Sequence, residues 1–448
     1  MKKTIFSIIF TIIIILSSIF VPFTVGAYEV TEFEVTADAG ALISLDTGEF
    51  LYEKNLDKKI YPAAITNIMT AVIVLESEKY ADSNTITMTE EALNEILGTG
   101  CAVSHLKAGE IITHLDLVHL ITVTSCGDCS LLAAKYFGGS VKGFVKMMNE
   151  KAKELGLENT HFTNPLGLHD DDHYTTVNDI YKLSTYALKN KTFKTASETS
   201  RYKLGATNMS NGRTYTTTNF LQDTTTAYYY RYAKGIKTGF TDEAGRCVVS
   251  TASYNGYNYM CILMGCKNNP NKRQEFIQSA NLYRWAFNNF SFKEIAHPEN
   301  PVCEIPVNYS MDTDFVPLYV ENGFISILPN DADTSTIIMD YHFKEESVDA
   351  PIKKGEILGT ADVIYAERVI GKVNLVAGND VSSNWMLVTF GFFEAVITSV
   401  YVKIIFAVVL AAIIVFIIVC IVMNLDRKRK KELKFIPYDP DKEDKLNK

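Results

Sequence analysis

The chain has 448 residues, a formal net charge of −9 at pH 7 and an apolar fraction of 47%. This apolar fraction provides enough side chains for a sizeable core, and the roughly 370 residues between the two ends are enough for two or three domains. The acidic balance argues against nucleic acid as a partner, because binding nucleic acid requires a basic face.

The first 27 residues have the pattern of a secretory signal peptide. Lys2 and Lys3 precede an apolar run over residues 5–21, and small residues follow at 25–27. A basic start, an apolar middle and a small-residue exit are typical of such signals, so we expect cleavage after Ala27. The alternative is an uncleaved anchor helix, for which the apolar run is slightly short.

Residues 28–295 combine strand and helix patterns. A hairpin is expected over 41–53 with its turn at 46–48 (Asp-Thr-Gly), and Pro62 opens an amphipathic helix over 65–78. Further helices are expected over 90–97, 115–123, 128–137, 141–155, 177–190 and 274–287, and strands over 246–252 and 257–266. Strands at both ends of the domain with helices between them predict an α/β sandwich with a largely antiparallel sheet.

The pattern changes after His297. Short strand-like runs separated by turn residues extend over 302–306, 316–319, 336–341, 357–365 and 369–376. They predict an all-β domain, which together with a stalk beginning near Gly378 occupies residues 296–399.

The C-terminal region predicts a membrane anchor. Residues 404–423 are apolar without a charge, and a basic cluster follows over 427–431. We therefore expect a transmembrane helix over 400–424 and a basic cytoplasmic tail over 425–448, because basic residues beside a span mark its cytoplasmic side. This predicts a single-pass protein of the cell membrane whose main body is extracytoplasmic. A buried core helix is the alternative, and the length, the flanking charges and the terminal position count against it.

Four stretches, in this order along the chain, resemble the D-alanyl-D-alanine carboxypeptidases, which are low-molecular-mass penicillin-binding proteins. They read AGALISLDTGEFLYEKN, YPAAITNIMTAVIVLE, FVKMMNEKAKELGLENTHFTNPLGL and KGIKTGFTDEAG. The later string APIKKGEILGTADV resembles the β domain that follows the catalytic domain in many members. The resemblance implies a β-lactamase/transpeptidase-like sandwich, with an antiparallel sheet and helices on both faces, over residues 28–295.

Members of this family cut the terminal D-alanine from peptidoglycan stem peptides with S-x-x-K, S-x-N and K-T-G motifs. The K-T-G motif is intact here as Lys237, Thr238 and Gly239. The resemblance implies that this strand binds the peptide backbone and the terminal carboxylate. A lysine on a strand edge can also be a solvated residue, but the long matching string around Lys237 favours a role that faces the ligand.

The other two motifs depart from the family pattern. Ala64 stands where the nucleophilic serine is expected, and Asn67 stands where its lysine partner is expected. Ser125 remains from S-x-N, but Gly127 occupies the asparagine position. A methyl group cannot attack a carbonyl, and a neutral amide does not titrate as a base. Ser125 alone has no obvious base in the sequence.

These departures predict a non-catalytic pseudoenzyme that binds a peptidoglycan stem peptide or a wall-remodelling enzyme. One alternative is an active carboxypeptidase rewired around Ser125 or Cys126. Another alternative is a single-span surface receptor, whose short tail would need a cytoplasmic partner. No cofactor is implied by any of these three interpretations.

The chain has eight cysteines, and their spacing suggests mostly buried free thiols. Cys126 and Cys129 form a C-x-x-C pair that could support redox chemistry or half of a zinc site, but the ligand set is incomplete. We interpret them as packed thiols and expect no metal. His173, which follows three aspartates at 170–172, is interpreted as part of a solvated loop.

Overall fold

The computed structural model describes residues 28, 30, 32–269 and 271–432, so the expected signal peptide and the last 16 residues of the expected tail lie outside the described residues. The chain forms two compact units. Unit 1 contains the described residues up to Ile295 together with Ile325–Ile338 and Ile364–Ile370. Unit 2 contains Ala296–Phe324, Met339–Val363 and the residues from Gly371 onward.

Unit 1 is built on a five-stranded antiparallel sheet with the order β2-β1-β9-β8-β7. Its strands are β1 (Ala39–Ser44), β2 (Phe50–Lys54), β7 (Ala233–Thr241), β8 (Gly245–Tyr254) and β9 (Tyr257–Cys266). The expected strands over 246–252 and 257–266 are therefore present, and the expected hairpin over 41–53 is β1 and β2.

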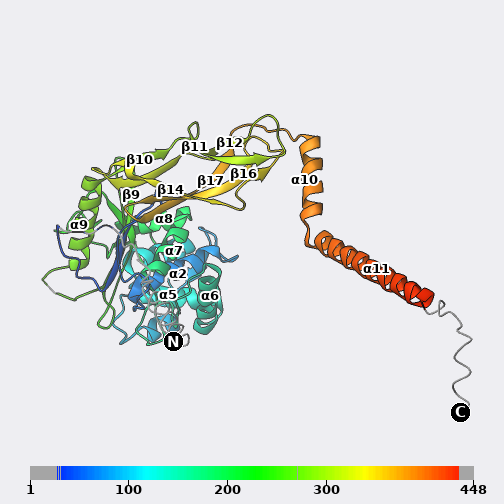
Figure 1. Ribbon diagram of the computed structural model, residues 1–448. Helices are drawn as coiled ribbons and strands as arrows, with labels where there is room; N and C mark the ends of the chain where they lie inside the picture. Colours follow the sequence, from blue (N-terminus) through cyan, green and yellow to red (C-terminus); the bar gives the residue numbers. More distant parts are fainter. Residues whose placement is uncertain (1–27, 29, 31, 270, 433–448) are drawn as a thin grey trace, which may run out of the picture. The chain divides into compact units, whose positions relative to one another are not determined.

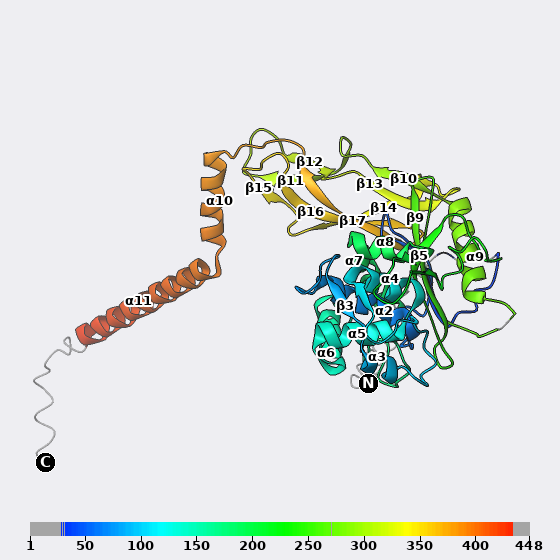
Figure 2. The ribbon, with the colours of Figure 1, turned by 180° about the vertical axis from the view of Figure 1, so that it is seen from behind.

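Both faces of this sheet are buried. Successive side chains of β9 point to opposite faces, and they pack into two different hydrophobic clusters. Met260, Ile262 and Met264 pack into one hydrophobic cluster, whereas Cys261 and Leu263 pack into the other. The first cluster lies under the helices between β2 and β7, and the second lies under α9 (Gln274–Asn289). Figures 1 and 2 show α9 on the opposite side of β9 from these helices. The expected sandwich with helices on both faces is confirmed.

The helical layer surrounds α2, and nearly all of α2 is buried. The helices of this layer are α2 (Asn67–Glu76), α3 (Glu90–Glu95), α4 (His114–Thr124), α5 (Gly127–Gly138), α6 (Val141–Glu154), α7 (Val177–Leu188) and α8 (Lys191–Ser197). Two short ribbons complete it: β3 (Thr85–Thr87) pairs with β4 (Ile111–Thr113), and β5 (Arg201–Leu204) pairs with β6 (Arg213–Thr216). A 3-10 turn, η1 (Ala63–Thr66), precedes α2 and carries the residues that open on the cavity described below.

Unit 1 also takes up a segment from much later in the chain. Strand β10 (Phe290–Ala296) pairs with β13 (Phe324–Pro329). The Glu49 carboxylate accepts hydrogen bonds from Ser326 Oγ and from the backbone N–H of Ile327. Ile327 is 1% exposed and belongs to the same hydrophobic cluster as α9. This segment lies within residues 296–399, the range expected for the all-β domain and its stalk.

The remaining strands form a six-stranded sheet with the order β14-β16-β17-β12-β11-β15. These strands are β11 (Pro301–Asn308), β12 (Phe315–Val320), β14 (Ile338–Phe343), β15 (Val348–Asp349), β16 (Ile357–Tyr365) and β17 (Arg368–Ala377). The expectation of a β-rich second domain is confirmed.

Two helices end the described chain, α10 (Trp385–Thr398) and α11 (Val400–Glu432). The segment Val400–Arg429 of α11 is long and apolar enough to cross a membrane. This helix is therefore compatible with the expected C-terminal membrane anchor. Helix α10 occupies the segment that sequence analysis described only as a stalk.

Candidate functional site

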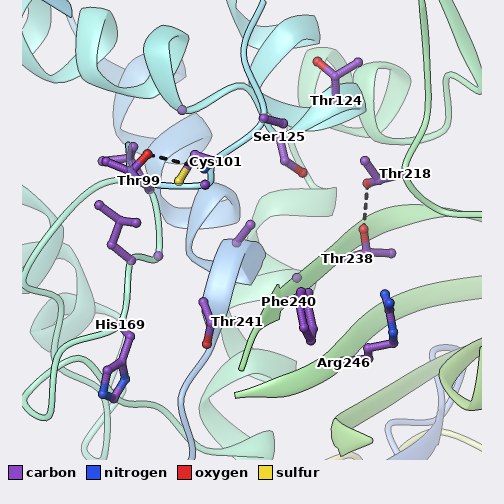
Figure 3. A pocket seen from close by; sticks show the side chains of 18 of the residues that line it. Thr99, Cys101, Thr124, Ser125, His169, Thr218, Thr238, Phe240, Thr241 and Arg246 are labelled. Carbon is purple, nitrogen blue, oxygen red and sulfur yellow. Dashed lines mark hydrogen bonds between the residues drawn. The ribbon is translucent and has the colours of Figure 1, made fainter. Parts of the chain in front are cut away.

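A cavity of about 830 Å³ opens in unit 1 between the start of η1, the end of α4 and the edge strand β7 (Figure 3). The sequence-predicted residues that line it are Ala64, Ser125, Gly127, Thr238 and Gly239. Residues far apart in the chain, from η1, α4 and β7, therefore meet at one site.

Ala64 lies in a backbone turn that several contacts hold in place. Ala63 has a left-handed φ of +47°, which is uncommon for a residue with a side chain. The Thr66 hydroxyl donates a hydrogen bond of 2.8 Å to the Ala63 carbonyl oxygen. A Cβ placed on Gly167 would lie 1.9 Å from that carbonyl oxygen, so only glycine allows the neighbouring loop to pack there. These contacts fix the position of Ala64 at the cavity wall.

His173 contacts Thr66 of the same turn. It is 1% exposed, so the expectation that it lies in a solvated loop is wrong. The backbone N–H of Thr163 donates to Nδ1, so the proton is on Nε2, which lies 2.9 Å from the Thr66 hydroxyl. Burial lowers the pKa of His173 to about 4. The ring is therefore neutral at physiological pH and donates to Thr66, which in turn donates to the Ala63 carbonyl.

Gly239 brings β7 against the Ala64 turn. A Cβ on Gly239 would lie 2.8 Å from Ala64 N and 3.0 Å from Ile65 N. Any larger residue would push the strand away from the turn. Beside Gly239, the Thr238 hydroxyl donates to Thr218 Oγ1 at 2.6 Å and lines the cavity.

Asn67 is the first residue of α2, and it is buried away from the cavity surface. Its Oδ1 accepts a hydrogen bond of 3.3 Å from Ser130 Oγ on α5. The amide therefore contributes to packing between two helices, and it is absent from the cavity lining.

Ser125 and Lys237 are in direct contact, which sequence analysis did not foresee. Ser125 ends α4 in a left-handed conformation with φ +58°, and its hydroxyl accepts a hydrogen bond from Lys237 Nζ. Lys237 is 2% exposed, so it is not a solvated edge residue, and its side chain does not line the cavity. Burial lowers the pKa of the Lys237 ammonium to about 7, opposed by the nearby Cys126. Ser125 thus has a potential base.

The position of Gly127 is closed by apolar side chains. A Cβ on Gly127 would lie 2.5 Å from Ile96 Cδ1, 2.9 Å from Leu166 Cδ2 and 3.0 Å from Cys101 Cβ. A longer polar side chain at this position therefore cannot enter without displacing these neighbours. The cavity corner beside Ser125 is apolar here.

Two arginines that were not expected from the sequence, Arg246 and Arg273, also line the cavity. Arg246 lies 4.8 Å from the Phe240 ring and donates from Nε to Asn268 Oδ1 at 2.9 Å. Burial, and then Arg273, lower the pKa of Arg246. An arginine retains its charge at neutral pH even so, and its planar fork suits a carboxylate. The signal that could have found Arg246 is its position directly after the KGIKTGFTDEAG string.

Cys126 and Cys129 are fully buried beside this site. Their sulfurs lie within 4.8 Å of each other and of an Asp128 carboxylate oxygen. The Asp128 carboxylate already accepts hydrogen bonds from the backbone N–H and the hydroxyl of Ser104. Burial raises the pKa of Cys129, which disfavours a thiolate. The arrangement fits packed thiols in a hydrogen-bonded network, and all eight cysteines are free thiols.

Fold and cavity together correspond to a known class of protein, the serine-type DD-peptidases that bind penicillin. Residues 26–268 match the D-alanyl-D-alanine carboxypeptidase family, and residues 290–383 match the C-terminal domain of penicillin-binding protein 5. The chain belongs to the D-alanyl-D-alanine carboxypeptidase family of peptidoglycan metabolism.

Individual relatives agree with this membership. The D-alanyl-D-alanine carboxypeptidase DacF of Bacillus subtilis is 27% identical over 352 residues, which cover 78% of this chain and 87% of the relative. DacC of Escherichia coli is 28% identical over 359 residues, covering 76% and 83%.

Solved structures show the same fold. Penicillin-binding protein 5 from Haemophilus influenzae superimposes with a TM-score of 0.64 at 24% identity, over 79% of this chain and 100% of the other. The Streptomyces K15 DD-transpeptidase has a TM-score of 0.53 at 27% identity, over 58% of this chain and 100% of the other.

Proposed function

We propose that this chain binds D-alanyl-D-alanine-terminated stem peptides of peptidoglycan without cleaving them. The observation that carries the proposal is the Ala64 turn. Its strained backbone, the glycine at 167 and the Thr66–His173 support are all present, yet the side chain at its apex is a methyl group. A methyl group offers no nucleophile for an acyl-enzyme.

The neighbouring groups support the same proposal. The Asn67 amide is buried against Ser130 and has no basic nitrogen, so it cannot accept a proton from a nucleophile. In another serine hydrolase the loss of the nucleophile lowers turnover by about a million-fold. Apolar side chains fill the space that an asparagine side chain at position 127 would need.

The binding side of the cavity is retained. Thr238 and Gly239 of the edge strand β7 line the cavity, and Arg246 adds a positively charged side chain to the lining. The cavity is large enough for a short peptide. A peptide with a free terminal carboxylate matches this combination of an exposed strand edge and a charged fork. We further propose that α11 spans the membrane with the body outside, the basic cluster at 427–431 inside and the first 27 residues removed as a signal.

Covalent labelling of the full-length protein with a fluorescent penicillin tests the loss of chemistry. The wild-type protein is expected to remain unlabelled. The Ala64→Ser plus Asn67→Lys double variant is the matched comparison, and label on it would show that the cavity still accepts the drug. Label on the wild-type protein would contradict the proposal, and peptide mapping would then identify the acylated residue.

Binding is tested separately by titrating the wild-type protein with a D-alanyl-D-alanine-terminated peptide and with its L-alanyl-L-alanine-terminated isomer. Saturable binding of the D-isomer, weakened by Arg246→Gln, is expected. Equal binding of both peptides, or no saturable binding of either, would contradict the ligand assignment.

A second candidate function is favoured by one observation, the contact between Ser125 and Lys237. A lysine whose pKa is about 7 is partly neutral at physiological pH and can take a proton from a hydroxyl, as Ser-Lys pairs do in other hydrolases. Ser125 would then attack in place of the missing serine. Release of D-alanine from the pentapeptide that disappears in Ser125→Ala would establish this activity, and its absence would leave peptide binding alone.

A further inference from the structure

Cys126 and Cys129 form the C-x-x-C motif of the sequence, and peptide binding gives this motif no role. Cys126 is the N-cap residue of α5, and Cys129 is the third residue of that helix. The N-cap residue and the third helical residue lie on the same side of a first helical turn, as they do in a capping box. Both side chains are 0% exposed. The start of α5 therefore holds two thiols together inside unit 1.

The two sulfur atoms are within reach of a bond. They lie within 4.8 Å of each other. Burial, and then a hydrogen bond with Cys126, raise the pKa of Cys129, so the two thiols are in contact. A disulfide needs Cα atoms about 4.4–6.8 Å apart, and residues three apart in a helical turn are separated by about 5 Å. Rotation of the two side chains is therefore enough to bring the sulfurs to bonding distance.

The Cys126 thiol also contacts the wall of the cavity. Its Sγ lies 2.8 Å from Thr124 Oγ1, and the Thr124 hydroxyl donates a hydrogen bond of 2.9 Å to the Leu120 carbonyl oxygen. A hydroxyl has one proton to donate, so the Cys126 thiol is the donor to Thr124. Thr124 and Ser125 both line the cavity. A change at Cys126 therefore acts directly on residues of the candidate site.

We infer that Cys126 and Cys129 are a redox-active pair, which forms an intrachain disulfide outside the cell and thereby weakens peptide binding in the cavity. The structure shows the dithiol state, in which all eight cysteines are free. Disulfides form and persist in oxidising extracytoplasmic compartments, and the body of this chain is proposed to lie there. The effect on the ligand rests on the proposed peptide binding, whereas formation of the disulfide does not.

The oxidant is an external disulfide, either a small molecule such as oxidised glutathione or the disulfide of an oxidoreductase. The Cys126 thiolate, at the N-terminus of α5, attacks one sulfur of the oxidant, which gives a mixed disulfide and one released thiol. The Cys129 thiolate then attacks the Cys126 sulfur and releases the second thiol. The two cysteine protons pass to the two released thiols. The cysteine pair loses two electrons, and the oxidant gains them.

Burial makes each state long-lived. Neither sulfur is exposed, and the Gly127 N–H at the start of α5 donates to the Ala102 carbonyl at 2.8 Å, which ties the preceding loop to the helix. Exchange therefore requires the first turn of α5 to open, or it occurs while the chain folds after export. We expect slow reaction with external thiols and disulfides in both directions.

The disulfide changes the cavity wall beside Ser125. Its formation turns Cys126 Sγ toward Cys129, so Thr124 Oγ1 loses its donor and presents an unsatisfied oxygen at the wall. Ser125, which precedes Cys126 and accepts a hydrogen bond from Lys237, is then held by a stiffer backbone. An oxygen without a donor disfavours a carboxylate beside it. We expect peptide affinity to fall by about fivefold, which matches the loss of one hydrogen bond.

Peptide mapping tests the bond directly. The full-length protein is incubated in glutathione buffers from fully reduced to fully oxidised, trapped with N-ethylmaleimide under denaturing conditions and cut with trypsin. The tryptic peptide 108–135 contains Cys126 and Cys129 and no other cysteine. We expect two alkyl groups on it after reduction and an internal disulfide after oxidation. A parallel sample is unfolded and refolded in each buffer, so that slow access does not hide the bond. Two alkyl groups in every buffer and in both samples would overturn the inference.

The chain provides a matched internal control. The tryptic peptide 247–267 contains three buried thiols of the central sheet, Cys247, Cys261 and Cys266. Three alkyl groups are expected on this peptide in every buffer. Equal oxidation of the two peptides would indicate a non-specific reaction and would also overturn the inference.

Titration of the D-alanyl-D-alanine-terminated peptide in both states tests the effect on the cavity. The oxidised wild-type protein should bind about fivefold more weakly than the reduced protein. The Cys129→Ser variant cannot form the bond and should bind equally in both buffers. A disulfide without a change in affinity, or the same change in Cys129→Ser, would overturn the effect on the cavity. Absence of saturable binding in both states would instead contradict the proposed function, and the mapping would then decide alone whether the pair is redox-active.

Discussion

The Lys237 ammonium donates a hydrogen bond to the Ser125 hydroxyl, although 112 residues separate the two in the sequence. Lys237 is on the edge strand β7 and Ser125 ends α4, so the contact joins the sheet to the helical layer at the cavity. Because Lys237 is buried, its charge state changes near neutral pH. Any carboxylate that binds beside Ser125 will experience that change.

Peptide binding should therefore depend on pH through Lys237. Below about pH 7 the lysine is charged and attracts the terminal carboxylate of the ligand, and above about pH 7 it becomes neutral. We expect affinity to fall by about tenfold, equivalent to 1.4 kcal/mol, as pH rises through this range. Titration of a labelled peptide from about pH 6 to about pH 9 measures the fall. Lys237→Met should flatten the profile, whereas Lys234→Met, an exposed lysine on the same strand, should not.

His173 should make the stability of unit 1 sensitive to acid. Its pKa is about 4 in the folded protein and 6.5 in the unfolded chain. Between these two pH values the imidazole is protonated in the unfolded chain but neutral in the folded protein. The free energy of unfolding should fall as pH decreases from 6.5 to about 4, by about 3 kcal/mol in total. Thermal unfolding at several pH values measures this loss. A His173→Gln variant should lose less stability over the same range; an unchanged slope would contradict the assignment to His173.

Gly167 should tolerate no side chain. Alanine there would combine a φ of +86° with a Cβ 1.9 Å from the Ala63 carbonyl oxygen. We expect Gly167→Ala to destabilise unit 1 by more than about 3 kcal/mol and to weaken peptide binding, because the Ala64 turn must move. The matched control is Gly156→Ala, with φ +65° and no atom within 4 Å of its Cβ, which should cost only about 1 kcal/mol. Equal melting temperatures for the two variants would show that the close approach is unimportant.

Gly127 and Ile96 should be energetically coupled. Gly127→Ala places a Cβ 2.5 Å from Ile96 Cδ1 and should cost about 1–3 kcal/mol by overpacking. Ile96→Ala alone should also destabilise, because it leaves a cavity in a site that is 4% exposed. The double variant should lose less than the sum of the two single losses. Gly205→Ala, which meets no atom within 4 Å, is the control and should change stability by less than about 0.5 kcal/mol. Strict additivity would rule out the proposed contact.

The fold could be predicted where residue patterns are strong. The continuous apolar run of β9 and the helical spacing in α2 are local signals, and both elements formed as expected. The expected helix over 177–190 ends at Leu188, because Asn190 caps a separate helix, α8. Helix α10 was not expected, because it is apolar on too many sides to show an amphipathic period. The pairing of β10 with β13 depends on distant contacts that no local pattern contains.

The candidate site was predicted only in part. The K-T-G strand, Ala64 and Ser125 were found from short motifs, and the structure brings them to one cavity. The base beside Ser125 was missed because the contact with Lys237 is tertiary. His173 was expected in a solvated loop because it follows a run of three aspartates in the sequence. Those aspartates are exposed, but the chain turns inward at His173.

The late segment that carries Ile327 determines when unit 1 can be completed. As the chain emerges from the ribosome, everything from β1 to α9 appears first, but the hydrophobic cluster under α9 still lacks Ile327, and Glu49 lacks its partners on Ser326 and Ile327. A nascent or truncated chain that stops at residue 295 therefore exposes apolar surface that the longer chain covers. Degradation and aggregation should concentrate on such fragments, and designs for isolating this unit should extend at least through Ile370, the last residue of unit 1.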